Sequence, residues 1–230
     1  MDYFTETKTI YGRVEKVIDG DTLRVTHCPT YFTCPDLPSP KVKPLSEATL
    51  SIRLYGVDCP ELQKKKSDPP SQPYAKQAKE YTSTVTLDKT IQLKLLKKDQ
   101  YGRAVSKISN YGTPINDLSL DLLSRGYAVM YTGKGAVYDG DDNKALFQQI
   151  QQTAKTTKVG MWSLGDEMMT PAEYKRMYKN QQNGQQQNQN QQQVPTALAT
   201  TATSSSPIVP MPAVPATSVV PGEIVAPATP

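Results

Sequence analysis

Residues 14–26 read Val-Glu-Lys-Val-Ile-Asp-Gly-Asp-Thr-Leu-Arg-Val-Thr, and this stretch carries the clearest signal of secondary structure in the chain. Two runs rich in β-branched residues meet at Asp19-Gly20, and Asp-Gly between such runs is a strong hairpin signal. After the turn, apolar and polar residues alternate, so that one face of the segment is apolar. We therefore predict two antiparallel strands, over residues 9–18 and 21–26.

Similar alternation later in the chain predicts further strands. In residues 49–57, Leu50, Ile52 and Leu54 point to one face, while Arg53 points to the other. The same pattern predicts three more strands, over residues 90–96, 104–109 and 127–131.

Helical spacing and capping signals predict the helices. We expect Asn116 to be the N-cap of the second helix, Gly126 to end it, and Gly160 to end the third. The predicted helices cover residues 74–87, 116–126 and 142–158, and Thr170 begins a last short helix. Residues 27–48 instead hold five prolines and little periodicity, which predicts an inserted loop.

These elements predict an α+β domain over residues 1–179 and a separate tail over residues 180–230. Strands in meander order, followed by helices, indicate a small barrel with about three packed helices. A five-stranded Greek-key barrel, the OB-fold, fits the strand count. The tail is a Gln/Asn tract followed by a Pro/Ala/Thr/Ser/Val stretch, with Glu223 as its one charged residue and no aromatic. Such a composition predicts disorder.

The charge balance is mildly basic. All 26 Lys and Arg residues and 21 of the 22 acidic residues precede the tail, so that basic residues exceed acidic ones there by five. This bias suits a polyanionic partner without demanding one. No run approaches the ~20 apolar residues of a bilayer-spanning helix, and the N-terminus lacks the pattern of a secretory signal. The compartment stays open, with the cytoplasm as the default expectation.

Five charged residues in three separate motifs indicate the chemistry. Each has a simpler explanation on its own, because aspartates form turns and most arginines are solvated. Together, two carboxylates suit a hard cation such as Ca²⁺, a third can activate water, and two planar guanidiniums can clamp a phosphate. The set predicts metal-assisted phosphodiester cleavage by Asp21, Arg53, Asp58, Glu61 and Arg103.

These motifs resemble the staphylococcal (thermo)nuclease family. The stretches that match it are Asp19-Gly20-Asp21-Thr22, Arg53-Leu54, Val57-Asp58, Pro60-Glu61 and Tyr101-Gly102-Arg103. Residues 121–128 and 160–163 further resemble its second helix and the end of its C-terminal helix, so that the resemblance covers about residues 9–164. It implies an OB-fold and a Ca²⁺-dependent endonuclease that acts on DNA and RNA and leaves 3′-phosphate ends.

The resemblance also implies roles for single residues. The implied catalytic residues are the phosphate clamps Arg53 and Arg103 and the general base Glu61. The implied metal ligands are Asp21, Asp58, the backbone carbonyl of Cys59 and, through water, Asp19. Tyr101 and Tyr131 would line the nucleotide site, where rings stack on bases. Gln100 replaces a lysine of the bacterial enzyme, which puts one substrate contact in doubt.

The expected partners are DNA and RNA, with single-stranded or unpaired regions favoured, and the expected state is a monomer. A second hypothesis is a binding module for nucleic acid or protein, like the degenerate nuclease domains of Tudor-containing family members. Such domains lose the acids and arginines that this chain keeps. A third hypothesis is a scaffold whose Gln/Asn tract drives association.

The three cysteines allow several readings. An odd count argues against a disulfide framework. His27, Cys28 and Cys34 lack a fourth ligand and zinc-like spacing, which disfavours zinc. Two alternatives remain, a loop with free thiols or, in an exported chain, a Cys28–Cys34 bridge. We expect Cys59 to be a small packing residue beside the site.

Overall fold

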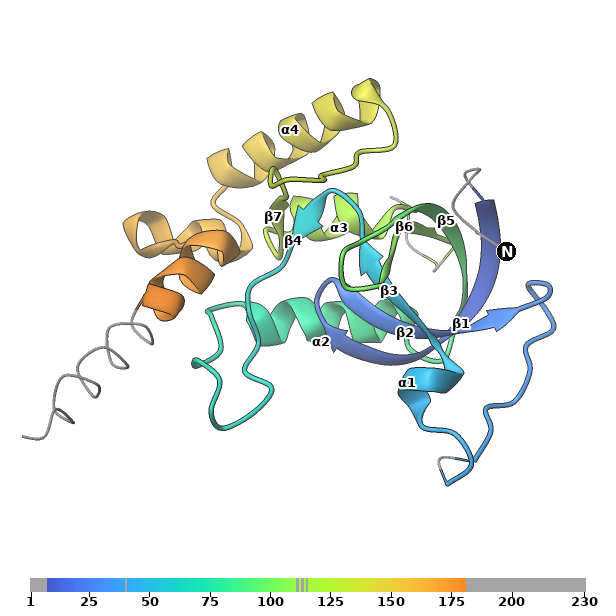
Figure 1. Ribbon diagram of the computed structural model, residues 1–230. Helices are drawn as coiled ribbons and strands as arrows, with labels where there is room; N and C mark the ends of the chain where they lie inside the picture. Colours follow the sequence, from blue (N-terminus) through green and yellow to red (C-terminus); the bar gives the residue numbers. More distant parts are fainter. Residues whose placement is uncertain (1–7, 40, 111, 113, 115, 181–230) are drawn as a thin grey trace, which may run out of the picture.

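The computed structural model describes residues 8–39, 41–110, 112, 114 and 116–180 (Figure 1). Residues 181–230, which make up nearly all of the predicted tail, lie outside the described residues.

A closed five-stranded barrel forms the centre of the molecule (Figure 1). Its strands are β1 (Lys8–Asp19), β2 (Thr22–Cys28), β3 (Leu50–Leu54), β5 (Thr90–Lys98) and β6 (Ala104–Ser109). They lie in the order β1-β2-β3-β6-β5, with β5 paired back to β1. The predicted α+β class and five-stranded OB-type barrel are confirmed. The meander order is wrong, because β6 runs parallel to β3 and separates it from β5.

The barrel register brings two of the sequence motifs to one rim. Thr22 lies opposite Arg53 across the β2–β3 pair, and Arg53 in turn lies opposite Val105 across the β3–β6 pair. The backbone N–H of Leu54 donates to the carbonyl of Asp21 over 2.9 Å. The barrel interior is filled by fully buried aliphatic side chains, including Val14, Leu23, Val25, Ile52, Ile91, Leu93 and Ile108.

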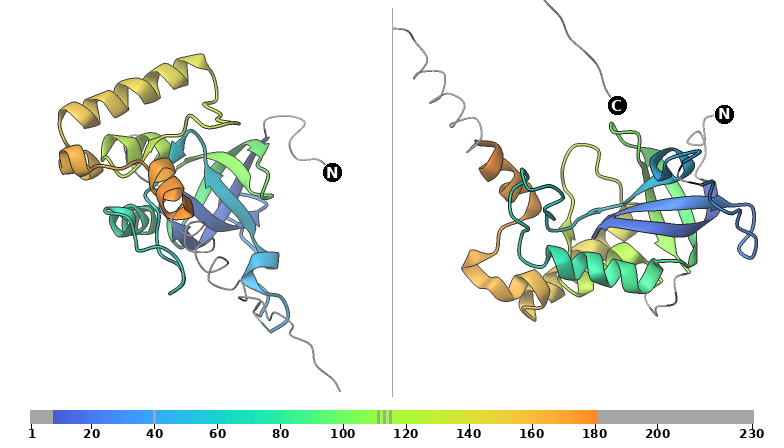
Figure 2. Two further views of the ribbon diagram at one scale, coloured as in Figure 1. Left: turned by 60° about the vertical axis from the view of Figure 1, so that its left-hand side comes forward. Right: turned by 90° about the horizontal axis from the view of Figure 1, so that it is seen from below.

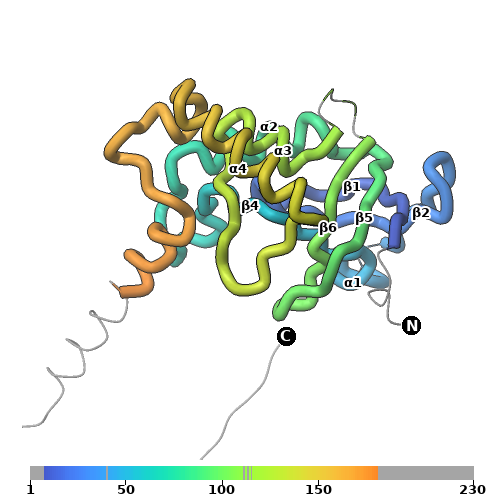
Figure 3. Tube along the Cα trace, turned by 90° about the horizontal axis from the view of Figure 1, so that it is seen from above, coloured from blue at the N-terminus to red at the C-terminus, as the bar shows by residue number. Residues whose placement is uncertain are grey.

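Helices cover one end and one side of the barrel (Figures 1 and 2). They are α1 (Leu45–Ala48), α2 (Ala75–Thr86), α3 (Leu118–Ser124), α4 (Asp141–Thr156), the 3₁₀ helix η1 (Gly160–Glu167) and a helix over residues 171–180. The helix α2 lies against β1 and buries Ala75, Ala78, Thr82 and Thr86. Figures 1 and 3 show the helix over residues 171–180 at the end of the molecule away from the start of β1.

Local signals placed two helix starts imprecisely. The N-cap of α3 is Asp117 rather than Asn116, since the Asp117 carboxylate accepts from the backbone N–H groups of Ser119 and Leu120. The N-cap of α4 is Gly140, which has no side chain to act as a cap. The predicted inserted loop also ends in the short helix α1, which makes it less irregular than expected.

A second, two-stranded sheet joins the barrel to the helices. It pairs β4 (Val57–Asp58), just after β3, with β7 (Val129–Met130), just before the loop that leads to α4. The pairing places Asp58, four residues after the end of β3, between the barrel and the helices.

Cys28 and Cys34 form a disulfide. Of the two alternatives left open for these residues, the bridge is therefore the one present, and the argument from an odd cysteine count was wrong for this pair. Cys59 is a buried free thiol that packs in the core, as expected. Among the described residues, no helix has the length and apolar character that crossing a bilayer requires.

Candidate functional site

A polar cleft of about 930 Å³ opens at the barrel rim beside β2, β3 and β4. The structure brings eight of the nine predicted site residues to its lining, namely Asp19, Asp21, Arg53, Asp58, Glu61, Tyr101, Arg103 and Tyr131. The ninth, Cys59, is buried directly behind it. The three motifs therefore meet in one place, although Asp21 and Arg103 lie 82 residues apart in the chain.

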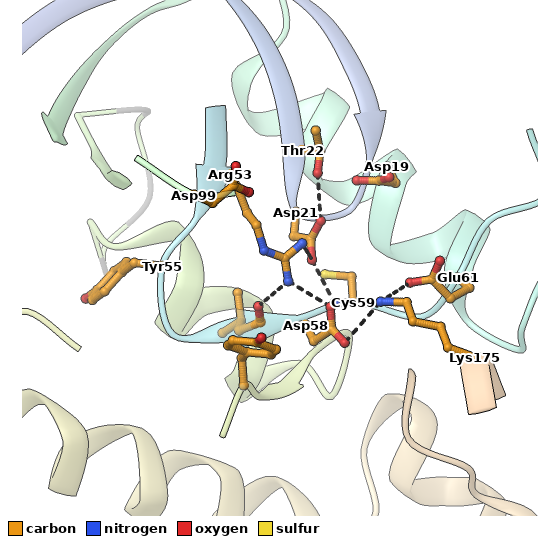
Figure 4. A network of polar contacts seen from close by, with 12 residues as sticks. Asp19, Asp21, Thr22, Arg53, Tyr55, Asp58, Cys59, Glu61, Asp99 and Lys175 are labelled. Atoms are coloured by element: carbon orange, nitrogen blue, oxygen red, sulfur yellow. Dashed lines mark hydrogen bonds and ion pairs between the residues drawn. The ribbon is translucent and has the colours of Figure 1, made fainter. Parts of the chain in front are cut away.

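Arg53 lies at the centre of the cleft (Figure 4). Its Nη1 lies 2.9 Å from Oδ2 of Asp21, and its Nη2 lies 2.8 Å from Oδ1 of Asp58. Nη2 also donates to the carbonyl of Val57 over 3.2 Å. Burial alone would lower the pKa of Arg53, but the two carboxylates outweigh burial and raise it. The guanidinium is thus permanently charged and oriented in a plane by two acids.

Asp21 is held in its charged form by several donors. Burial raises the pKa of this carboxyl, but the charge of Arg53 and hydrogen bonds lower it below its usual range. Thr22 Oγ1 donates to Oδ1 over 2.9 Å, and the backbone N–H of Cys59 donates to Oδ2 over 3.2 Å. Burial, and then the charge of Asp21, raise the pKa of the Cys59 thiol, which keeps it neutral. Cys59 thus contributes its backbone to the site.

Asp19 lies on the turn beside Asp21 and is less well satisfied. Burial and the neighbouring charge of Asp21 raise the pKa of Asp19 to about 6. Lys64 Nζ lies 2.6 Å from its Oδ2, while its Oδ1 is buried without a hydrogen-bond partner among the described residues. Asp19 and Asp21 raise the negative charge density here, and Oδ1 of Asp19 is buried with no hydrogen-bond partner in the described part of the chain. A cation would be stabilised at this position.

Arg103 is positioned by the turn between β5 and β6. Asp99 Oδ2 accepts from Arg103 Nε over 2.7 Å, and Asp99 Oδ1 accepts from its backbone N–H over 2.9 Å. The Arg103 guanidinium lies 5.5 Å from the ring of Tyr101, which is 74% exposed. Arg53 lies 5.7 Å from the ring of Tyr131. Each arginine is thus paired with a tyrosine whose ring faces the cleft.

The cleft is also lined by charged residues that were not predicted as site residues, among them Asp99, Lys64 and Lys175. Lys175 Nζ lies 2.8 Å from Oε1 of Glu61 and 3.4 Å from Oδ2 of Asp58. Burial would lower the pKa of Lys175, but the Asp58 and Glu61 charges raise it. No local pattern could place this lysine in the cleft, because 117 residues separate it from Asp58.

The residues of the cleft fit a hard divalent cation. Carboxylate and carbonyl oxygens are the ligands that Ca²⁺ prefers, and the unpartnered Oδ1 of Asp19 lies beside the acid pair that Arg53 bridges. Within the described part of the chain, no set of three or more His, Cys, Asp or Glu side chains is arranged to hold an ion by itself. A bound cation would therefore need backbone or water oxygens as well.

The barrel and the cleft define the structural class of this protein. It is a small OB-type barrel whose rim carries a cleft lined by arginines and carboxylates. The family model described as staphylococcal nuclease homologue matches residues 51–164. The chain belongs to this family.

Three relatives show the same likeness over longer stretches. Endonuclease Htp3 of Saprolegnia parasitica is 38% identical over 76% of this chain and 79% of its own length. Two proteins named probable endonuclease LCL3 are each 34% identical. The one from Schizophyllum commune aligns over 80% of this chain and 65% of its own length, and the one from Yarrowia lipolytica over 74% and 76%.

Proposed function

We propose that this chain is a calcium-dependent endonuclease that hydrolyses phosphodiester bonds of DNA and RNA and leaves 3′-phosphate ends. The observation that supports it best is the convergence of Asp21, Arg53, Asp58, Glu61 and Arg103 on one cleft. Membership of the staphylococcal nuclease family and the endonuclease names of three relatives support the same activity.

The two arginines would stabilise the phosphate during cleavage. Both guanidiniums line the cleft, and their carboxylate partners, two for Arg53 and one for Arg103, occupy only part of each donor set. A planar guanidinium can use its remaining N–H groups on non-bridging phosphate oxygens. Donors that are already oriented need little reorganisation as charge develops in the transition state, which is why such groups contribute strongly to catalysis.

Glu61 would accept the proton of the attacking water. It lies at the cleft edge, and its side chain is 37% exposed, so that water reaches it. Asp21 and Asp58, with the Cys59 carbonyl and water held by Asp19, would hold the calcium ion. When bound, calcium supplies positive charge that stabilises the phosphate and favours ionisation of water.

Tyr101 and Tyr131 would bind the bases next to the scissile bond. Their rings flank the two arginines at the cleft, and aromatic rings stack on unpaired bases of any sequence. Single-stranded or unpaired DNA and RNA would therefore be preferred over intact duplexes. The competing function is that of a catalytically weak binding module, which would bind the same strands without cutting them.

The decisive experiment compares cleavage of single-stranded DNA with calcium and with chelator. We expect cleavage with calcium, none with chelator, and products whose 3′ phosphate is removed by a phosphatase. Removing one preorganised donor, as in Arg103→Ala, should lower kcat by roughly 10²- to 10³-fold. Binding without cleavage in calcium would favour the binding module, and equal activity of Arg103→Ala would contradict the site assignment.

A further inference from the structure

A lysine from beyond the family match reaches the centre of the cleft. The family model ends at residue 164, and Lys175 lies on the helix over residues 171–180. Figure 4 shows its side chain extending from this helix to Glu61 and Asp58. Its ammonium lies 2.8 Å from the Glu61 carboxylate. The site is therefore built partly by a segment that the family pattern does not include.

The segment before this helix is linked to the backbone of Glu61 by hydrogen bonds of Gln72. Gln72, which is buried, accepts from the Glu61 backbone N–H over 3.1 Å through its side-chain oxygen and donates over 2.5 Å to the carbonyl of Met169. Its own backbone N–H donates to the Glu61 carbonyl over 2.8 Å. One side chain thus connects the loop that holds Glu61 to the segment just before the helix that holds Lys175.

Two further contacts fix the helix in the orientation that points Lys175 inward. Thr170 and Glu173 form a capping box, in which the Thr170 N–H donates to Glu173 Oε2 and the Glu173 N–H donates to Thr170 Oγ1. Tyr174 is buried, and its hydroxyl donates to the carbonyl of Pro70. Because these residues adjoin Lys175, its direction is set by the packing of its neighbours.

The Glu61 carboxylate depends on this one partner. Within the described part of the chain, it forms no ion pair or hydrogen bond other than that with Lys175. A half-exposed carboxylate without a partner samples several rotamers, and misplacement of a reacting group by about 1 Å can cost roughly 100-fold in rate. The remaining contact of Lys175, with Asp58, ties the same ammonium to the acid that Arg53 bridges.

Resting on the function proposed above, we infer that Lys175 is a positioning residue of the reaction, which holds the Glu61 carboxylate in its working orientation. The nuclease unit accordingly extends past residue 164 to include the helix over residues 171–180. Two other roles are possible outcomes of the test. A surface ion pair would contribute little, and a direct phosphate contact would act on substrate affinity.

The test compares Lys175→Met with Lys175→Arg, and with Lys179→Met as a control one turn further along the same helix. Lys175→Met keeps the length and apolar stem but removes the charge. We expect it to lower kcat by roughly 10- to 100-fold with KM for single-stranded DNA within about threefold of the parent. Lys175→Arg should restore most of kcat, and Lys179→Met should match the parent.

A double-mutant cycle separates positioning from other roles. If Lys175 acts through Glu61, adding Lys175→Met to Glu61→Gln should lower kcat no further, because the group it positions is already lost. Additive losses, a change confined to KM, or a Lys175→Met enzyme as active as Lys179→Met would overturn the inference. A parent enzyme that fails to cleave with calcium would instead contradict the proposed function.

Discussion

Arg53 contributes both to the stability of the folded protein and to the proposed chemistry of the cleft. Its guanidinium bridges two carboxylates that are almost fully buried, those of Asp21 and Asp58. Buried charges of like sign are tolerated only when they are paired. The same arginine that is proposed to bind the phosphate therefore also offsets the repulsion between these two carboxylates.

Replacing Arg53 by Met should destabilise the protein as well as inactivate it. The change leaves two buried carboxylates facing each other, and removing one partner of a buried pair costs about 3 kcal/mol or more. The measurement is urea unfolding in the presence of chelator. Arg103→Met is the control, because its pair with Asp99 is more exposed and should cost under about 1 kcal/mol. Equal stability of the two variants would contradict this account of Arg53.

Calcium should stabilise Arg53→Met more than it stabilises the parent. In the variant no arginine competes for the Asp21 and Asp58 oxygens, and a ligand that binds only the folded state raises stability in proportion to its affinity. Thermal unfolding with calcium and with magnesium gives the comparison without any need for activity. An unfolding temperature that calcium leaves unchanged in both proteins would argue against a metal site at these acids.

Among the secondary-structure elements, the β1–β2 turn packs between α2 and Cys59, the residue that follows β4. A Cβ on Gly20 would lie 2.8 Å from Cys59 Sγ and 2.9 Å from the Cβ of Ala78. Thr82 on α2 donates to the carbonyl of Gly20 over 2.8 Å. The glycine is thus required by close approach, and the turn that bears Asp19 and Asp21 rests directly on a helix.

Gly20→Ala should therefore lower both stability and activity. Forcing a methyl group into this contact displaces the turn from α2 and should cost roughly 1–3 kcal/mol of unfolding free energy. Because Asp21 follows directly, cleavage should fall even at temperatures where circular dichroism shows a folded protein. Thr82→Val removes the other contact at the same turn and should cost about 1 kcal/mol. A Gly20→Ala variant with the parent's stability would show that the turn can accommodate a Cβ, which would contradict the close-approach argument.

Features of the fold and of the cleft that depend on neighbouring residues could be predicted from the sequence, and those that depend on distant contacts could not. Alternation located the barrel strands, and Asp-Gly located the hairpin, because both depend on neighbouring residues. The order of β5 and β6 depends on barrel closure, and the cap at Asp117 depends on a choice between adjacent polar residues. The motif set predicted which residues share the cleft. Lys175 could not be found, because its place depends on contacts with Gln72 and Pro70 about 100 residues away.

At the scale of the whole molecule, the described chain is a barrel with a helical side that extends past the family match. The segment over residues 168–180 packs against the loop before α2 through Gln72 and Tyr174. Residues 181–230 contain one charged residue and no aromatic. The predicted boundary near residue 179 therefore separates a segment that completes the cleft from one whose composition favours no core.

Two shortened chains test this boundary. A chain that ends at residue 180 should match the full chain in urea midpoint and in calcium-dependent cleavage, since no packing contact of the described residues is removed. A chain that ends at Glu167 loses the buried Tyr174 and the Gln72–Met169 hydrogen bond, which should cost roughly 2–4 kcal/mol, and cleavage should fall with the loss of Lys175. If the shorter chain equals the full one, the functional unit ends where the family match ends. If the longer one is weakened, the tail stabilises the folded domain.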